Sequence, residues 1–99
     1  MTQVGSVYGE ALYTLALEES LSAGILEELS ALEQAFHAEP DFIRLLSTPN
    51  LSVQERCKIL DNSFRDQVEP YLLHFLKLLT EKGYMRHFGS CCKAYKKHK

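Results

Sequence analysis

The side chains with the most reactive chemistry lie near the carboxyl end of the chain. His87 and Cys91 are four residues apart and Cys92 follows directly, so one helix could bring two or three soft ligands to a zinc ion. The spacing matches no closed four-ligand pattern, and His98 lies on the basic tail. The sequence therefore predicts no metal and no cofactor, and Cys91 is expected to be only partly covered.

A nucleophilic site would need a cysteine or serine beside a histidine, with an acid to orient it. Cys57 and His74 could be neighbours in a helical bundle, but Cys57 also fits a core position as a small hydrophobic side chain. The glycines are isolated, so no loop resembles a phosphate cradle. They are Gly5, Gly9, Gly24, Gly83 and Gly89. We expect a protein without catalytic activity.

Length and composition limit the alternatives further. The chain has 99 residues and a mass of 11.3 kDa, which predicts one domain over residues 1–99. Its three cysteines are an odd number and two are adjacent, so a disulfide framework is not expected. No segment approaches the roughly 18 apolar residues that cross a bilayer, so we expect no direct membrane insertion.

Charge is distributed unevenly. All 13 acidic residues lie before residue 84, whereas residues 84–99 contain five basic residues and no acidic one. The tail could be a solvated helix end, or it could bind an anionic partner. A small helical nucleic-acid-binding protein that uses this basic helix is the alternative function, although the acidic body of the chain argues against nucleic acid as a partner.

Apolar residues recur at intervals of three and four rather than two, which predicts helices throughout. The fold class predicted is all-α, a compact six-helix bundle. The expected helices cover Val4 to Glu19, Ala23 to His37, Pro40 to Leu46, a segment that begins after Ser52, Pro70 to Lys82 and Tyr84 to Tyr95.

Several helix ends have local signals. Ser22 is a candidate N-cap, and Ser52 with Glu55 forms the pattern of a capping box. Pro70 fits a first helical turn, and Gly83 fits a left-handed helix end. The helix after Ser52 is expected to bury one stripe made of Val53, Cys57, Leu60 and Phe64.

The first and fifth helices each carry two adjacent apolar rows. The core-facing rows are predicted to be Gly9, Leu12 and Ala16 in one helix and Leu72, Leu76 and Leu79 in the other. The outer rows are Val4, Val7, Tyr8, Ala11 and Leu15, and Tyr71, Phe75, Leu78 and Lys82. Such helices could simply be central in their own bundle. Alternatively, they pack side by side and form an apolar groove for a partner helix, which makes the outer rows the candidate binding site.

Three segments carry a family resemblance. Residues 8–16 (YGEALYTLA), residues 26–29 with 40–49, and above all residues 71–83 (YLLHFLKLLTEKG) resemble the delta subunit of F-type ATP synthases, called OSCP in mitochondria. The match covers essentially the whole chain in the right order and spacing. His74 and Tyr84 depart from the asparagine and arginine usual in the family at these positions.

The resemblance implies a non-catalytic stator adaptor that holds the catalytic head to the peripheral stalk. It implies that the groove between the first and fifth helices binds the N-terminal helix of an alpha subunit. It also implies that the chain is the N-terminal domain, without the C-terminal region that meets the stalk's b subunits. We expect a domain that is monomeric when isolated and belongs to a bacterial complex, peripheral on the cytoplasmic side of the cell membrane.

Overall fold

The computed structural model describes residues 4–97, and within them it contains helices and no strand. Helix α1 (Val4–Glu18) is followed by α2 (Ser22–Ala38), α3 (Pro40–Ser47), α4 (Val53–Phe64), α5 (Pro70–Lys82), the short 3₁₀ turn η1 (Met85–His87) and α6 (Phe88–Lys97). The predicted all-α bundle is confirmed. The last helix differs from its prediction in one respect, because it enters through η1 before the α-helical turns begin.

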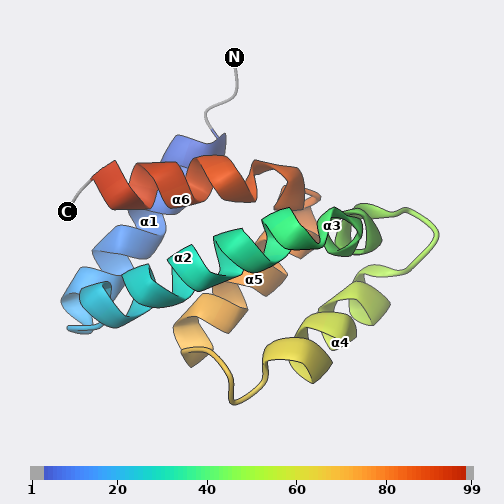
Figure 1. Ribbon diagram of the computed structural model, residues 1–99, viewed down its shortest axis with the longest axis horizontal. Coiled ribbons are helices and arrows are strands. Elements are labelled where there is room, and N and C mark those ends of the chain that lie inside the picture. The colour runs from blue at the N-terminus through green and yellow to red at the C-terminus, as the bar shows by residue number, and fades with distance from the viewer. Residues whose placement is uncertain (1–3, 98–99) are drawn as a thin grey trace.

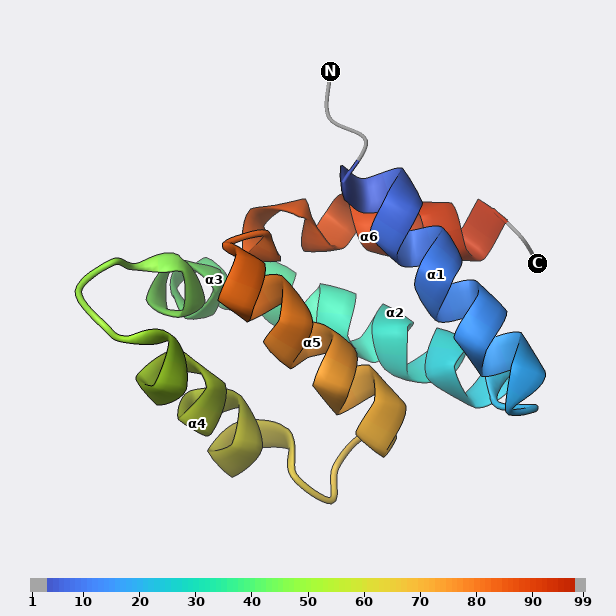
Figure 2. The same ribbon diagram turned by 180° about the vertical axis from the view of Figure 1, so that it is seen from behind.

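The helices form two faces of a flat bundle. In Figure 1, α2 and α6 cross the front of the molecule, with α3 at one end. In the reverse view of Figure 2, α1 and α5 both lie on the near face, and α4 stands beside α5. Helix α1 packs mainly on α6, and α5 mainly on α4. The first and fifth helices share one face, but neither makes its main contact with the other.

Two residues in α1 bring its backbone onto α6. A Cβ atom added to Gly9 would lie 2.7 Å from the Ala94 Cβ, and still closer to the carbonyl oxygen of Cys91. A Cβ atom on Gly5 would overlap the side chain of Ser90. Because glycine has no Cβ, the two helices meet at a separation that no larger residue permits at these positions. We call this contact the α1–α6 seam.

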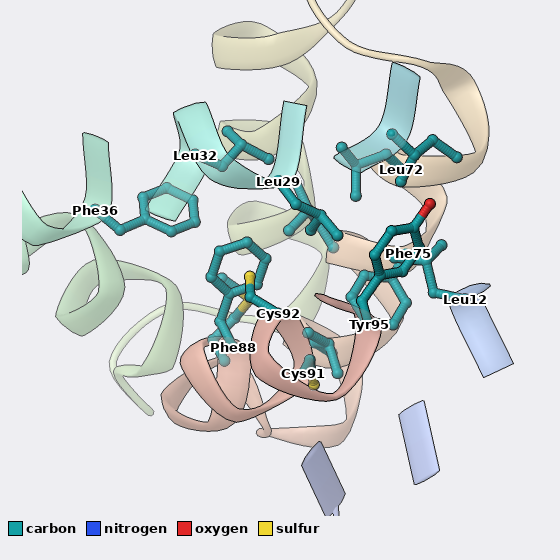
Figure 3. Packing of buried hydrophobic residues seen from close by; sticks show 14 of the residues in the cluster. Leu12, Leu29, Leu32, Phe36, Leu72, Phe75, Phe88, Cys91, Cys92 and Tyr95 are labelled. Atoms are coloured by element: carbon teal, nitrogen blue, oxygen red, sulfur yellow. The ribbon is translucent and has the colours of Figure 1, made fainter. Parts of the chain in front are cut away.

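The core runs between the two faces (Figure 3). One end holds Leu12, Phe75 and Tyr95, and the other holds Phe36 and Phe88, whose rings meet edge to face with centroids 5.1 Å apart. Leucine is the commonest buried side chain, and a core at close packing density leaves little room for a change of volume.

Polar contacts fasten α6 to α2. The Tyr95 hydroxyl donates a hydrogen bond of 2.6 Å to the carbonyl oxygen of Ser22, and the Lys96 Nζ lies 2.6 Å from the Glu33 carboxylate. Burial raises the pKa of Tyr95, because the apolar surroundings disfavour its charged form. These contacts fix the last helix across the start and the middle of α2.

Local signals set several helix ends as predicted. The Ser52 hydroxyl accepts a 3.1 Å hydrogen bond from the Glu55 N–H, and the Glu55 carboxylate accepts one of 2.9 Å from the Ser52 N–H. Pro70 occupies the first turn of α5, and Gly83 ends it with a φ of 75°. The predicted capping box and left-handed helix end are therefore confirmed.

Two helix-level predictions are wrong. Ser22 is not a cap: it lies inside α2 and the preceding Leu21 offers no side-chain hydrogen bond. The bend is made two residues earlier, where Ser20 takes a φ of 59° and the Leu21 N–H donates to the Ala16 carbonyl at 2.7 Å. This left-handed turn already closes α1 and positions α2.

The stripe predicted for α4 is buried at only one position. Leu60 is fully covered, whereas Val53 is 38% exposed and Cys57 is half-buried. The physical reason is that α4 lies at the edge of the bundle, where it packs on α5 and α3, so a stripe that suits a central helix is only partly covered.

Candidate partner-binding surface

The candidate surface consists of the outer rows of α1 and α5, which share the face seen in Figure 2. On α1, Val7 is 58% exposed and Ala11 is exposed, while Val4, Tyr8 and Leu15 are half-buried. The α1–α6 seam explains this arrangement, because the helix face that carries Gly5 and Gly9 is turned toward α6. The opposite side of α1 is thereby presented to solvent.

On α5 the predicted outer row divides into exposed and covered positions. Tyr71 is 39% exposed, Leu78 is half-buried and Lys82 is exposed, but Phe75 is only 6% exposed. Phe75 therefore belongs to the core and not to the outer row as predicted. The large ring is drawn into the bundle between the two helices, where it joins Leu12 in the buried cluster.

Tyr84 connects the ends of the two helices. Its ring meets that of Tyr8 edge to face, with centroids 5.7 Å apart, and also lies 6.0 Å from the His87 ring. Edge-to-face pairs of this kind stabilise by about 0.5–1.5 kcal/mol beyond the area they bury. Tyr84, which departs from the usual family residue, thus packs α1 against the turn after α5. His74, the other departure, is exposed.

The role of the two α1 glycines was missed at the level of sequence, where Gly9 was assigned only to a core row. The signal was available, because Gly5 and Gly9 are four residues apart, as are Ser90 and Ala94 on α6. Small residues at this interval lie on one helix face and permit backbones to approach. They control where the outer row of α1 lies.

The cysteines do not assemble into a reactive site within residues 4–97. Burial raises the pKa of the Cys91 thiol to about 11 and that of Cys92 to about 12, so both are protonated at neutral pH. Cys91 is fully buried, which corrects the expectation that it is partly covered. Burial, followed by the negative charge of Glu81, raises the pKa of Cys57.

The remaining groups with possible chemistry are the metal-ligating side chains and the basic residues of the tail. No three histidine, cysteine or acidic side chains converge on a metal position in residues 4–97, and His98 lies outside this range. Of the basic residues in the tail, Lys96 is paired with Glu33, and Lys99 lies outside the described residues. None of the described helices combines the length and apolarity that crossing a bilayer requires.

An all-helical bundle that exposes apolar side chains along one face is typical of protein–protein interaction domains. Comparison with known proteins places it in a family: the family model described as ATP synthase delta (OSCP) subunit matches residues 4–99. The chain therefore belongs to the ATP synthase delta (OSCP) subunit family, as the resemblance of its helices predicted.

Individual relatives agree with this assignment. The delta subunit of the ATP synthase of Alkaliphilus oremlandii is 36% identical over 80 residues, which cover 81% of this chain and 44% of the relative. That of Gloeobacter violaceus is 30% identical over 99 residues, covering 96% of this chain and 52% of the relative. The chain thus spans about half the length of these relatives.

Proposed function

We propose that the chain is a non-catalytic adaptor domain in the stator of a rotary ATP synthase. Its role is to bind the N-terminal helix of an alpha subunit on the face formed by α1 and α5, and so to hold the catalytic head. The observation that carries the proposal is the family match over residues 4–99 together with the exposed apolar row of α1.

Each residue of the proposed site has a place in this arrangement. Val4, Val7, Ala11 and Leu15 form the α1 side, and Tyr71, Leu78 and Lys82 form the α5 side, with Tyr8 and Tyr84 at one end. Phe75 contributes from below as part of the floor, because it is covered by the bundle itself. The small Ala11 side chain leaves space for another helix to approach closely.

The charge and position of Lys82 fit the same role. It lies in the last turn of α5, where its long apolar stem can lie along a bound helix while its ammonium group stays in water. A carboxylate on the bound helix would then have a partner at the rim. Such a rim pair affects the rate of association and the register more than the affinity.

The wider context of the proposal comes from the family. In the assembled enzyme the domain would link the head to the peripheral stalk, whose b subunits would meet the part of the family's sequence that lies beyond this domain. The complex would place it on the cytoplasmic side of a bacterial membrane as a peripheral component. A stator must resist the torque of the rotor, so this role requires a rigid, tightly bound helix and no catalytic group.

Titration of a synthetic alpha-subunit N-terminal peptide into isotopically labelled domain tests the proposal. We expect amide shifts at Val4, Tyr8, Ala11, Leu78 and Lys82, and smaller indirect shifts at Phe75. Ala11→Asp should weaken binding by about 2 kcal/mol, because a carboxylate would be desolvated in the interface. Ala31→Asp, on an exposed position of α2, is the matched control and should bind normally. Unmoved signals at saturating peptide would reject the proposal.

A further inference from the structure

A second depression is formed by residues of α2, α3, η1 and α6. Three adjoining hollows, of about 600, 460 and 590 Å³, all have Arg86 in their lining. Their linings come from α2, α6, η1 and α3, the helices that Figure 1 shows around the crossing of α2 and α6. We call the three together the Arg86 groove. No residue of α1 or α5 is in its lining.

The middle of the Arg86 groove is apolar. Its central hollow is lined by Phe36, Ile43, Met85 and Phe88 among others. Three of these side chains are almost fully covered by the bundle and make a rigid floor, whereas Ile43 on α3 is half-buried and exposes part of its surface. This hollow has the size and lining to accept apolar side chains from a ligand.

The ends of the Arg86 groove are basic. Arg44 lines it on the α3 side, and Lys93 and Lys96 line it on the α6 side, with Arg86 between them. Glu33 is the acidic residue in the lining, and its carboxylate is already neutralised by Lys96 at 2.6 Å. The groove therefore has a surplus of positive charge.

These basic side chains can bind a ligand only if they are not already paired with acidic side chains of the same chain. Among residues 4–97 no ion pair is found for Arg86 or Lys93. Arg44 faces Asp41 at 3.3 Å, but both side chains are more than four-fifths exposed, and a pair in that environment contributes little. Arg86, Lys93 and in part Arg44 can thus receive carboxylates from outside the chain.

The shape of the groove distinguishes among ligands. Residues 86–96 span roughly 15 Å at the rise of a helix, which is about three turns of a partner helix laid alongside. A nucleic acid would offer phosphates to the cations but nothing to the apolar middle. A helix with an apolar stripe flanked by carboxylates would match both parts at once.

We propose that the Arg86 groove binds an acidic amphipathic helix of a partner protein, with its apolar stripe over Ile43 and its carboxylates at Arg86 and Lys93. The site is separate from the alpha-helix site proposed above. The lining of the groove shares no residue with that site, so the two proposals concern different surfaces.

Two labelled synthetic peptides of about 15 residues, the length at which isolated helices begin to persist, serve as probes. One has leucines on one face flanked by glutamates, and the other replaces every glutamate by lysine. We expect the acidic peptide to bind in fluorescence anisotropy and to shift the amides of Phe88 and Gly89. The lysine peptide should bind at least about tenfold more weakly, and raising the salt concentration should weaken only the acidic one.

Charge reversal in the groove, with a matched control, locates the binding. R86E with K93E should weaken the acidic peptide at least about tenfold. K58E with R65E reverses the same number of charges at exposed positions of α4 and its end, and should change affinity less than about twofold. The neutral pair R86Q and K93Q should give an intermediate loss, and circular dichroism checks that each variant is folded.

Several outcomes would overturn the proposal. Equal binding of both peptides would indicate non-specific apolar association, and shifts confined to α1 and α5 would place the peptide at the other site. If the protein self-associates at high concentration, and R86E with K93E abolishes this, the occupant of the groove is a second copy of the chain.

If random duplex DNA binds in a charge-sensitive way and the acidic peptide does not bind, the ligand of the groove is nucleic acid. Because the alpha-peptide titration reports on α1 and α5, the two proposals can fail separately.

Discussion

The α1–α6 seam and the α4–α5 pair hold the bundle together by different means. In the seam, Gly5 and Gly9 bring one backbone directly onto another, and Cys91 beside it is fully buried. In the pair, α4 buries only Leu60 and adds a half-exposed ion pair between Lys77 and Asp61 at 2.7 Å. The seam therefore has no room for added volume, whereas α4 has one fully buried side chain and otherwise packs through partly buried ones.

This difference bears on the proposed function. The helix that presents the exposed apolar row is the one seated by backbone contact, so its position cannot change without opening the seam. Helix α4 lies at the edge and takes no part in either proposed site. A rigid attachment of the helix that a partner would contact suits the proposed stator role.

Leu60→Ala should cause the largest loss of stability. Removal of a fully buried leucine leaves a cavity, and we expect the free energy of unfolding to fall by about 3 kcal/mol. Val53→Ala, at a position 38% exposed on the same helix, should change it by less than about 0.5 kcal/mol. Urea denaturation followed by circular dichroism measures both, and equal losses would mean that α4 is anchored by its whole stripe.

The Cys57 thiol should react about 100 times faster than the thiols of Cys91 and Cys92. This ratio corresponds to about 2.7 kcal/mol. Cys57 in the α4–α5 pair is half-buried, whereas burial raises the pKa of Cys91 to about 11 and that of Cys92 to about 12. At pH 8 the buried thiols are almost entirely protonated and sterically covered. A disulfide reagent should therefore modify Cys57 quickly and both Cys91 and Cys92 slowly. Three equal rates would show that the seam opens readily.

Gly9→Ala should lower the free energy of unfolding by about 2 kcal/mol, because its methyl group would be forced against Ala94 and the Cys91 carbonyl. Gly89→Ala is the matched control: nothing lies within 4 Å of a Cβ at Gly89, and alanine favours the helix, so stability should rise by about 0.5–1 kcal/mol. Thermal and urea unfolding distinguish the two. A neutral Gly9→Ala would mean that the seam can widen.

Ser52→Ala should cost about 1 kcal/mol, since it removes the acceptor for the Glu55 N–H at the start of α4. Gln54→Ala, exposed on the same turn, provides the comparison and should be close to neutral. A loss at Gln54 as large as that at Ser52 would remove the capping box as the cause. The measurement is again urea denaturation at neutral pH.

Acid should weaken the same cap. The hydrogen bond from the Ser52 N–H lowers the pKa of Glu55 below its ordinary value of 4.5. A lowered folded pKa means that the stabilisation is complete above pH 4.5 and is lost as the pH falls through the folded value. Wild-type stability should therefore decline relative to Glu55→Gln in that range. Parallel pH profiles for the two proteins would contradict the assignment.

Features decided within one turn of chain were predictable from the sequence. The capping box at Ser52 and the helix end at Gly83 depend on residues no more than four positions apart. Their physical chemistry does not depend on the rest of the fold. The family resemblance, carried by the order and spacing of the helices, belongs to the same kind of information.

Features that depend on how one helix packs against another were not predictable from the sequence. Glu28 of α2 accepts a 2.8 Å hydrogen bond from the N–H of Glu69, which lies 41 residues later and directly before α5. Phe75 lies on a stripe that periodicity could place inside or outside, and only the neighbouring helix covers it. In both cases the deciding contact comes from a distant part of the chain.

The sequence by itself determined that this protein is a bundle of helices of the delta (OSCP) family, where most helices begin and end, and which apolar rows exceed an ordinary core stripe. Only the tertiary structure decided that α1 rests on α6, that Phe75 is internal and that Arg86 lies among three adjoining hollows. The reason is that helix formation depends on neighbours three and four residues away. Burial and charge neighbourhood depend instead on how whole helices are stacked.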